Sequence, residues 1–293
     1  MLTRRDVILA GAAILPFHRL VAAGWSRGSF DPDRERLVEW VRRLRREVRI
    51  DVPARAIRAA ELALGSPYEA FTLEAYLREG GSPAREPLTL SLSRFDCVSL
   101  VESALAVARV AAGGEASWDR FGREVERMRY RGGKRSGYTS RLHYFSEWIS
   151  DGAARGLLTD RGEELGAEAD TRPLRFMTAH RASYPALADD GIFAGIAAME
   201  RGLDSRPRRV VPRERVAEVT DRIESGDVLA FATSIEGLDV SHAALAFRDR
   251  TGVLRVLHAP LSGGVVEITR SSLPEYVSAI RRCTGIMVAR PLS

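Results

Sequence analysis

The chain has 293 residues, of which 45% are hydrophobic and 28% charged, and its formal net charge is +5. This apolar content excludes an intrinsically disordered chain, because it is enough to build a large buried core. The arginines form short clusters rather than one dense basic stripe with interleaved aromatic residues, which argues against a nucleic-acid-binding protein.

The first 23 residues have the pattern of an export signal. Arg4 and Arg5 precede a short apolar run, and small residues follow at a position suited to cleavage. The paired arginines favour the twin-arginine route, with cleavage near Ala23 and a periplasmic or exported product. A retained membrane anchor is the alternative, but the run is well short of the roughly 20 apolar residues that span a bilayer. Residues 24–293 are therefore expected to form one domain with no transmembrane segment.

Helical periodicity dominates the first half of this domain. Apolar residues recur every three or four positions, with glycine and proline between the segments. The predicted helices cover residues 33–48, 53–64, 72–78, 118–128, 141–149 and 187–203.

One further helix begins at a cysteine. Asp96 is its predicted N-cap, and the apolar residues that follow Cys97 at helical spacing place this helix in the core. Free backbone N–H groups and the helix dipole at a helix start favour a thiolate, so we expect a lowered pKa for Cys97. The alternative is a buried core cysteine.

Cys97 and Cys283 are the two cysteines of the chain. In an oxidising compartment they could form a disulfide, but a nucleophilic Cys97 has to stay reduced. Two cysteines exclude an all-cysteine zinc site within one chain. A site made of Cys97 and two histidines is the remaining metal alternative, and we find no carboxylate base to accompany it. We therefore expect no metal and no cofactor.

From Ser225 onward the apolar pattern alternates, as in half-buried strands. Helices followed by an antiparallel sheet predict the α+β class. The predicted strands cover residues 226–232, 239–247, 253–258, 264–268 and 284–290, and a helix with Ser271 as its N-cap covers 271–280.

Two histidines lie on neighbouring predicted strands. His242 shares a face with Ala244 and Ala246, whose small side chains leave room for a helix end. A three-residue connection within 249–252 would put His242 and His258 on one face, opposite or diagonal to each other, and a two-residue connection would separate them. A thiol, an imidazole base and a polar group that orients the base are the requirements of covalent acyl transfer. Either histidine alone could instead be a hydrogen-bonded core residue.

Residues 129–138 form a basic, glycine-rich segment with two tyrosines. Loops of this kind often carry ligands, so Arg131 is a candidate contact for sugar or peptide carboxylates. The alternative is a surface loop whose arginines lie along the protein.

Several short motifs follow one another in a fixed order. They are Gly65-Ser66-Pro67-Tyr68, Asp96-Cys97-Val98, Gly226-Asp227-Val228, Ser241-His242-Ala243 and His258-Ala259. Together they resemble the motifs of NlpC/P60 cysteine peptidases, which cut peptidoglycan stem peptides. A longer pattern is similar to the DUF1460 branch of that superfamily; it comprises 129–133, Tyr138, Arg141, His143-Tyr144 and 237–242. The resemblance extends from about Glu61 to the end of the chain.

The resemblance implies a papain-like NlpC/P60 fold in which the nucleophile helix packs on a C-terminal antiparallel sheet, with helical insertions at about 114–222. It also implies that Cys97 is the nucleophile, that His242 is the base and that His258 orients it.

We expect further site residues beside these three. Tyr68 matches the active-site tyrosine of the family, and Asp96, Arg131 and Tyr138 are expected to contact substrate. Two departures concern the pocket: Val98 stands where many NlpC/P60 enzymes have serine, and the spacing between the two histidines is longer than usual.

The function implied by the branch is that of an N-acetylmuramoyl-L-alanine amidase acting on muropeptides. Two alternatives stay open: a D,L-endopeptidase that cuts within the stem peptide, and a non-catalytic wall-binding module. The expected partners are peptidoglycan fragments rather than nucleic acid, and we expect a monomer.

Overall fold

The computed structural model describes residues 31–47, 51–262 and 264–293. The predicted export signal, residues 1–23, lies outside these residues. Within the described part of the chain, no helix is both long enough and apolar enough to cross a membrane.

The N-terminal half is helical, as predicted. Aspartate or serine side chains cap several helix starts, and proline occupies the first turn of the two earliest helices. The helices are α2 (Pro32–Arg46), α3 (Val52–Leu62), α4 (Ala75–Arg78), α5 (Cys97–Ala112), α6 (Trp118–Arg129), α7 (Phe145–Ala154), α8 (Phe176–Ala179), α9 (Asp190–Asp204), α10 (Val216–Val219) and α11 (Leu273–Ala279). Short 3₁₀ turns cover Thr72–Glu74, Pro83–Arg85, Arg131–Gly133, Tyr138–Ser140, Arg181–Ser183, Pro185–Ala188, Arg213–Arg215 and Thr220–Arg222.

An antiparallel sheet makes up the C-terminal half, so the α+β class is confirmed. In the described residues it has eight strands in the order β2-β3-β8-β4-β5-β6-β7, and β1 pairs with β8. The strands are β1 (Leu158–Asp160), β2 (Glu168–Asp170), β3 (Arg208–Pro212), β4 (Val228–Thr233), β5 (Val240–Arg248), β6 (Leu254–His258), β7 (Glu267–Ile268) and β8 (Cys283–Pro291).

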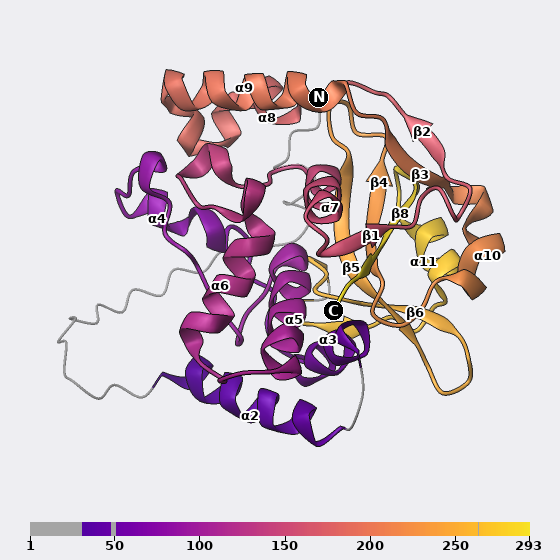
Figure 1. Cartoon of the computed structure of the whole chain (residues 1–293). Helices are drawn as coiled ribbons and strands as arrows, with labels where there is room; N and C mark the ends of the chain where they lie inside the picture. Colours follow the sequence, from indigo (N-terminus) through magenta and orange to yellow (C-terminus); the bar gives the residue numbers. More distant parts are fainter. Residues whose placement is uncertain (1–30, 48–50, 263) are drawn as a thin grey trace.

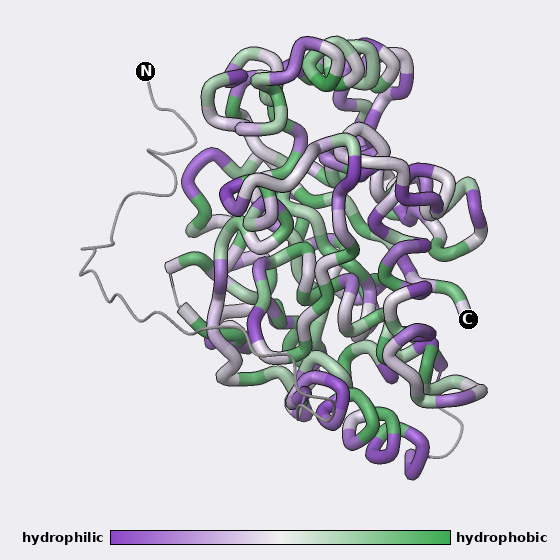
Figure 2. Tube along the Cα trace, turned by 90° about the vertical axis from the view of Figure 1, so that its left-hand side faces the viewer, coloured by the Kyte–Doolittle hydropathy of each residue, from purple (hydrophilic) through white to green (hydrophobic). Residues whose placement is uncertain are grey.

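Helix α5 lies at the centre of the molecule, among α2, α3, α6 and the sheet (Figure 1). Its residues from Leu100 to Ala111 are all buried. Hydrophobic segments lie mostly inside the molecule and hydrophilic ones mostly at its periphery (Figure 2). A buried ion pair between Glu102 and Arg129, 2.7 Å apart, joins α5 to α6. The cysteine helix is therefore held on all sides, which fixes the position of its first residue.

The structure also differs from the predicted elements. The helix predicted at 141–149 begins only at Phe145, because the backbone of Arg141 forms a bridge with Tyr130. The N-cap of α11 is Ser272 rather than Ser271, in a capping box with Glu275. Strands β1 to β3 were not predicted, since each is short and packs at the margin of the sheet.

Candidate active site

Cys97 is the first residue of α5. The Asp96 carboxylate caps the helix by accepting a hydrogen bond from the Ser99 backbone N–H at 2.7 Å, and the Ser99 hydroxyl accepts one from the Asp96 N–H at 2.9 Å. This capping box confirms the predicted N-cap and fixes where the helix begins. Cys97 is partly exposed and, like Cys283, is a free thiol.

The hairpin β5–β6 brings the two histidines together. Asp249 N donates to Val253 O across the connection 250–252, so the three-residue alternative is the one observed. Gly252 takes the positive φ of +88° that this turn needs. His242 and His258 are then diagonal neighbours on one face, and Nε2 of His242 lies 2.8 Å from Nδ1 of His258.

The position of α5 relative to these rings differs from the expectation. The His242 ring stacks on Phe231, and this face of the sheet packs on α11. Helix α5 packs on the opposite face, against Ala243 and Leu245. The expectation that α5 would end beside Ala244 and Ala246 was therefore wrong. Cys97 reaches β5 from the other side, where the backbone N–H of Ala243 is a hydrogen-bond donor to its sulfur.

Cys97 and His242 nevertheless line one cavity of about 310 Å³. Tyr68 and Asp96 lie in its wall as well, so four of the seven predicted site residues meet there. A β-bulge in β5, between the pairs Phe231–His242 and Ala232–Val240, interrupts the regular pairing at this point. Bulges of this kind re-aim side chains next to active sites.

Electrostatics in this cavity favour neutral groups. Burial raises the pKa of the Cys97 thiol to about 12, and the Asp96 carboxylate raises it further. Backbone N–H groups, first that of Ala243, act in the opposite direction. The expectation of a lowered thiol pKa was therefore wrong for this state, because desolvation outweighs the helix start.

Both imidazoles are neutral for the same reason. Burial lowers the pKa of His242 to about 3, with a smaller contribution from neighbouring His258. Burial alone lowers the pKa of His258 to about 4. A neutral imidazole beside a protonated thiol can act as a general base once substrate is bound.

Two residues next to His258 were missed by the sequence analysis. The Tyr276 hydroxyl on α11 lies 3.2 Å from Nδ1 of His258. A carboxylate oxygen of Glu267 on β7 lies 3.6 Å from Nε2 of the same ring. Glu267 pairs with His258 across β6 and β7. The alternating pattern indicates a strand here, but it cannot fix the register of a strand of only two residues.

The outer wall of the cavity is mainly apolar, with one ion pair. Arg141 is almost fully buried and lies 2.6 Å from the Glu74 carboxylate; both residues line the cavity. Phe71, also in the wall, has a left-handed backbone with φ of +62°. Such strain in an aromatic residue is typical of functional sites.

The remaining two predicted contacts lie away from the cavity surface. Arg131 is held by the Glu147 carboxylate at 2.6 Å and by the Thr139 carbonyl at 2.8 Å. Tyr138 is completely buried, with its ring against His143 and the Arg141 guanidinium. These residues support the wall from behind and do not line the cavity.

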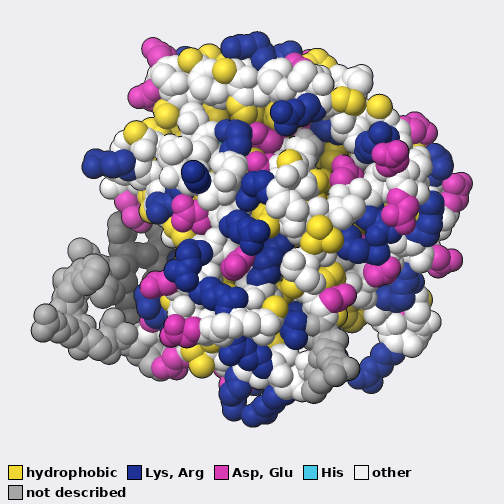
Figure 3. Space-filling view, in the orientation of Figure 1, with side chains coloured by type: hydrophobic (Ala, Val, Ile, Leu, Met, Phe, Trp, Pro, Cys, Tyr) yellow, Lys and Arg dark blue, Asp and Glu magenta, His cyan; other side chains and the backbone are white. Residues whose placement is uncertain are grey.

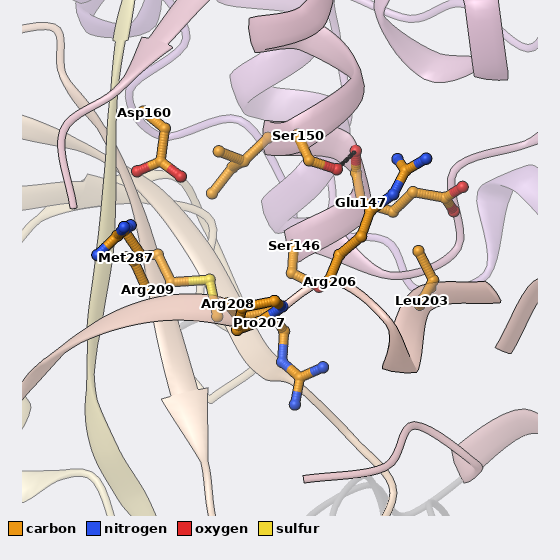
Figure 4. A pocket seen from close by; sticks show the side chains of 11 residues that line it. Ser146, Glu147, Ser150, Asp160, Leu203, Arg206, Pro207, Arg208, Arg209 and Met287 are labelled. Carbon is orange, nitrogen blue, oxygen red and sulfur yellow. Dashed lines mark hydrogen bonds between the residues drawn. The ribbon is translucent and has the colours of Figure 1, made fainter. Parts of the chain in front are cut away.

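A second, smaller cavity lies between α7, β1, β3 and β8 (Figure 4). Its volume is about 50 Å³, which suits a few water molecules at most. Arg206, Arg208 and Arg209 contribute to its lining, which contains no cysteine or histidine.

On the face drawn in Figure 3, basic and acidic side chains are interspersed. Within the described residues, no group of three or more His, Cys, Asp or Glu is arranged to hold a metal ion.

Comparison with known proteins finds a family model that matches most of the chain. The profile of the family described as AmiA-like, N-acetylmuramoyl-L-alanine amidase-like, matches residues 58–286. No curated protein matches the chain.

Several solved structures share the fold. An N-acetylmuramoyl-L-alanine amidase from Bacteroides uniformis is 29% identical, with a TM-score of 0.76 over 83% of this chain and 99% of that one. A Bacteroides fragilis protein described as a "putative xylanase" is 32% identical, with a TM-score of 0.72 over 79% and 99%. A Legionella pneumophila protein of family DUF1460 is 18% identical and shares the fold, with a TM-score of 0.64 over 89% and 96%.

Proposed function

Because this chain belongs to the AmiA-like, N-acetylmuramoyl-L-alanine amidase-like family, we propose that it is a cysteine amidase that cleaves the N-acetylmuramoyl-L-alanine bond of muropeptides. The observation that carries the proposal is the hydrogen bond between His242 and His258 beside a cavity that Cys97 and His242 line together. The 29% identical Bacteroides uniformis protein bears the name of this activity.

The chemistry begins with the thiol of Cys97. Its proton passes to Nδ1 of His242, because Nε2 of that ring is engaged with His258. The sulfur attacks the carbonyl carbon of the lactyl group, and backbone N–H groups near the helix start stabilise the oxyanion. His242 then protonates the departing L-alanine nitrogen as the C–N bond breaks. Water hydrolyses the lactyl thioester and restores the thiol.

The proposal extends to the rest of the protein. The order of a nucleophile at a helix start and two histidines on later strands supports a papain-like NlpC/P60 fold, with residues 24–293 as one catalytic domain. Residues 1–23 act as a cleaved export signal, and the mature protein works as a monomer. The mass of the protein isolated from the periplasm tests the cleavage, and its size in solution tests the monomeric state.

Digestion of purified muropeptides tests the activity. Mass spectrometry should find stem peptides with a free L-alanine amine, and the Cys97→Ala variant should produce none. Cys283→Ala is the matched control and should retain activity, since Cys283 is packed in the core away from the cavity. L-Alanine still attached to the sugar, with a cut inside the stem, would identify the D,L-endopeptidase instead. Xylan, the substrate class in one relative's name, should stay intact.

Retained wall-directed activity in Cys97→Ala would overturn the proposal and favour a non-catalytic binding module. The same variant would then bind muropeptides as well as the wild type does.

A further inference from the structure

The second ring nitrogen of His258 has an unusual environment. Nε2 is buried and has no hydrogen-bond partner within the described residues, although a buried polar atom normally has one. Oε1 of Glu267 lies 3.6 Å away, beyond hydrogen-bond distance but within reach of an electrostatic contact. Glu267 is directly opposite His258 in the β6–β7 pairing, and its side chain is 47% exposed. The carboxylate is thus aimed at this nitrogen from the solvent side.

The protonation pattern of the two rings decides whether His242 is a base. If His258 carries its proton on Nε2, its Nδ1 accepts a hydrogen bond from Nε2–H of His242, and Nδ1 of His242 is free to take a proton. If His258 carries its proton on Nδ1, it donates to Nε2 of His242, which then holds its own proton on Nδ1. Only the first arrangement leaves a base for Cys97.

We infer that Glu267 is a positioning residue that holds His258 in the Nε2–H form and thereby keeps Nδ1 of His242 available as the base. This inference rests on the proposed function. The carboxylate attracts the proton on Nε2 across 3.6 Å, and it stabilises the positive charge that reaches the histidine pair when the thiol gives up its proton.

The other groups around His258 do not favour either of its two protonation forms, Nδ1–H or Nε2–H. The Tyr276 hydroxyl, at 3.2 Å, can donate to Nδ1 or accept from it. Burial raises the pKa of the Tyr276 hydroxyl, so this group stays neutral and keeps both its donor and its acceptor capacity. Glu267 is the carboxylate within ion-pair distance of His258 in the described part of the chain.

Nitrogen NMR of the histidine rings tests the inference directly. The chain has five histidines, so ring signals can be assigned by single substitutions. At pH 7, the wild type should show His258 as the Nε2–H form. Glu267→Met, which keeps the length but removes the acceptor, should raise the Nδ1–H population, and Glu267→Gln, a neutral acceptor, should lie between them.

Alkylation of Cys97 by iodoacetamide, followed by peptide mass spectrometry, gives a second readout. Glu267→Met should react about 3- to 10-fold more slowly than the wild type, with partial rescue in Glu267→Gln. Glu164→Met removes another exposed carboxylate that pairs with an arginine and should change neither readout.

A wild-type His258 protonated on Nδ1 would overturn the inference, as would a Glu267→Met variant that matches the wild type in both measurements. Neither readout uses muropeptide. Failure of muropeptide cleavage with the expected ring forms would therefore reject the proposed activity and leave the role of Glu267 intact.

Discussion

Nε2 of His242 and Nδ1 of His258 lie 2.8 Å apart, on strands whose pairing makes the rings diagonal neighbours. In the proposed mechanism, the second ring holds the first in the orientation that a base requires. His258→Ala should therefore lower kcat for muropeptide cleavage about 100-fold or more, with little change in KM. His258→Gln should retain more activity, since its amide oxygen can still accept from His242.

The control for this pair is His180→Gln, which changes a histidine that does not line the catalytic cavity. Its steady-state kinetics should match those of the wild type. Unchanged kcat in His258→Ala would show that His242 needs no partner.

The stability of the protein should depend on pH through the buried histidines. Burial lowers the pKa of His258 from 6.5 to about 4, so the unfolded chain binds this proton more readily than the folded protein. The free energy of unfolding should fall as the pH drops from about 6.5 to about 4, by about 3 kcal/mol at most from this group. Urea denaturation across this range measures the slope, which should be smaller in His258→Gln. Equal slopes in the two proteins would contradict the assignment of this pH dependence to His258.

Asp96 should affect helix stability and thiol reactivity separately. Asp96→Asn keeps a capping side chain, but it removes the charge that raises the pKa of Cys97. Iodoacetamide should then label Cys97 about twofold faster or more at pH 8, with little loss of stability. Asp96→Ala should cost about 1 kcal/mol. Ser117→Ala, which uncaps α6, should lose similar stability without faster labelling of Cys97.

Arg131 should prove to be a structural residue. Arg131→Ala leaves the almost buried Glu147 carboxylate without its partner, which should reduce the free energy of unfolding by about 1 to 2 kcal/mol. KM for muropeptide should stay within about twofold of the wild type, because Arg131 does not line the cavity. Arg123→Ala, an exposed arginine of α6, serves as the comparison. A KM several-fold higher in Arg131→Ala alone would restore the substrate contact expected from sequence.

Local periodicity made the central elements predictable. The apolar spacing after Cys97 defines a buried helix, and alternation around His242 and His258 defines two strands of one hairpin. Because the 250–252 connection has an odd number of residues, both rings lie on the same face of the hairpin. These features depend on neighbours in sequence, and the structure confirms them.

Contacts between distant segments were not predictable in the same way. Tyr276 reaches His258 from a helix 18 positions later, and Glu267 does so from a strand of only two residues. The thiol pKa depends on how completely the surrounding segments exclude water, which no local pattern reports. The basic segment near Arg131 looked like a ligand loop because its buried acidic partner, Glu147, lies 16 positions away in sequence.

The tip of the β5–β6 hairpin does not line the cavity that Cys97 and His242 share, yet its length determines whether the two histidines meet. Adding or deleting a single amino acid among 250–252 would rotate every later side chain of β6 by half a turn about the strand, which would take His258 away from His242. Only a change by an even number of residues would keep both rings on one face, so strand geometry constrains the length of a turn that lies outside the cavity.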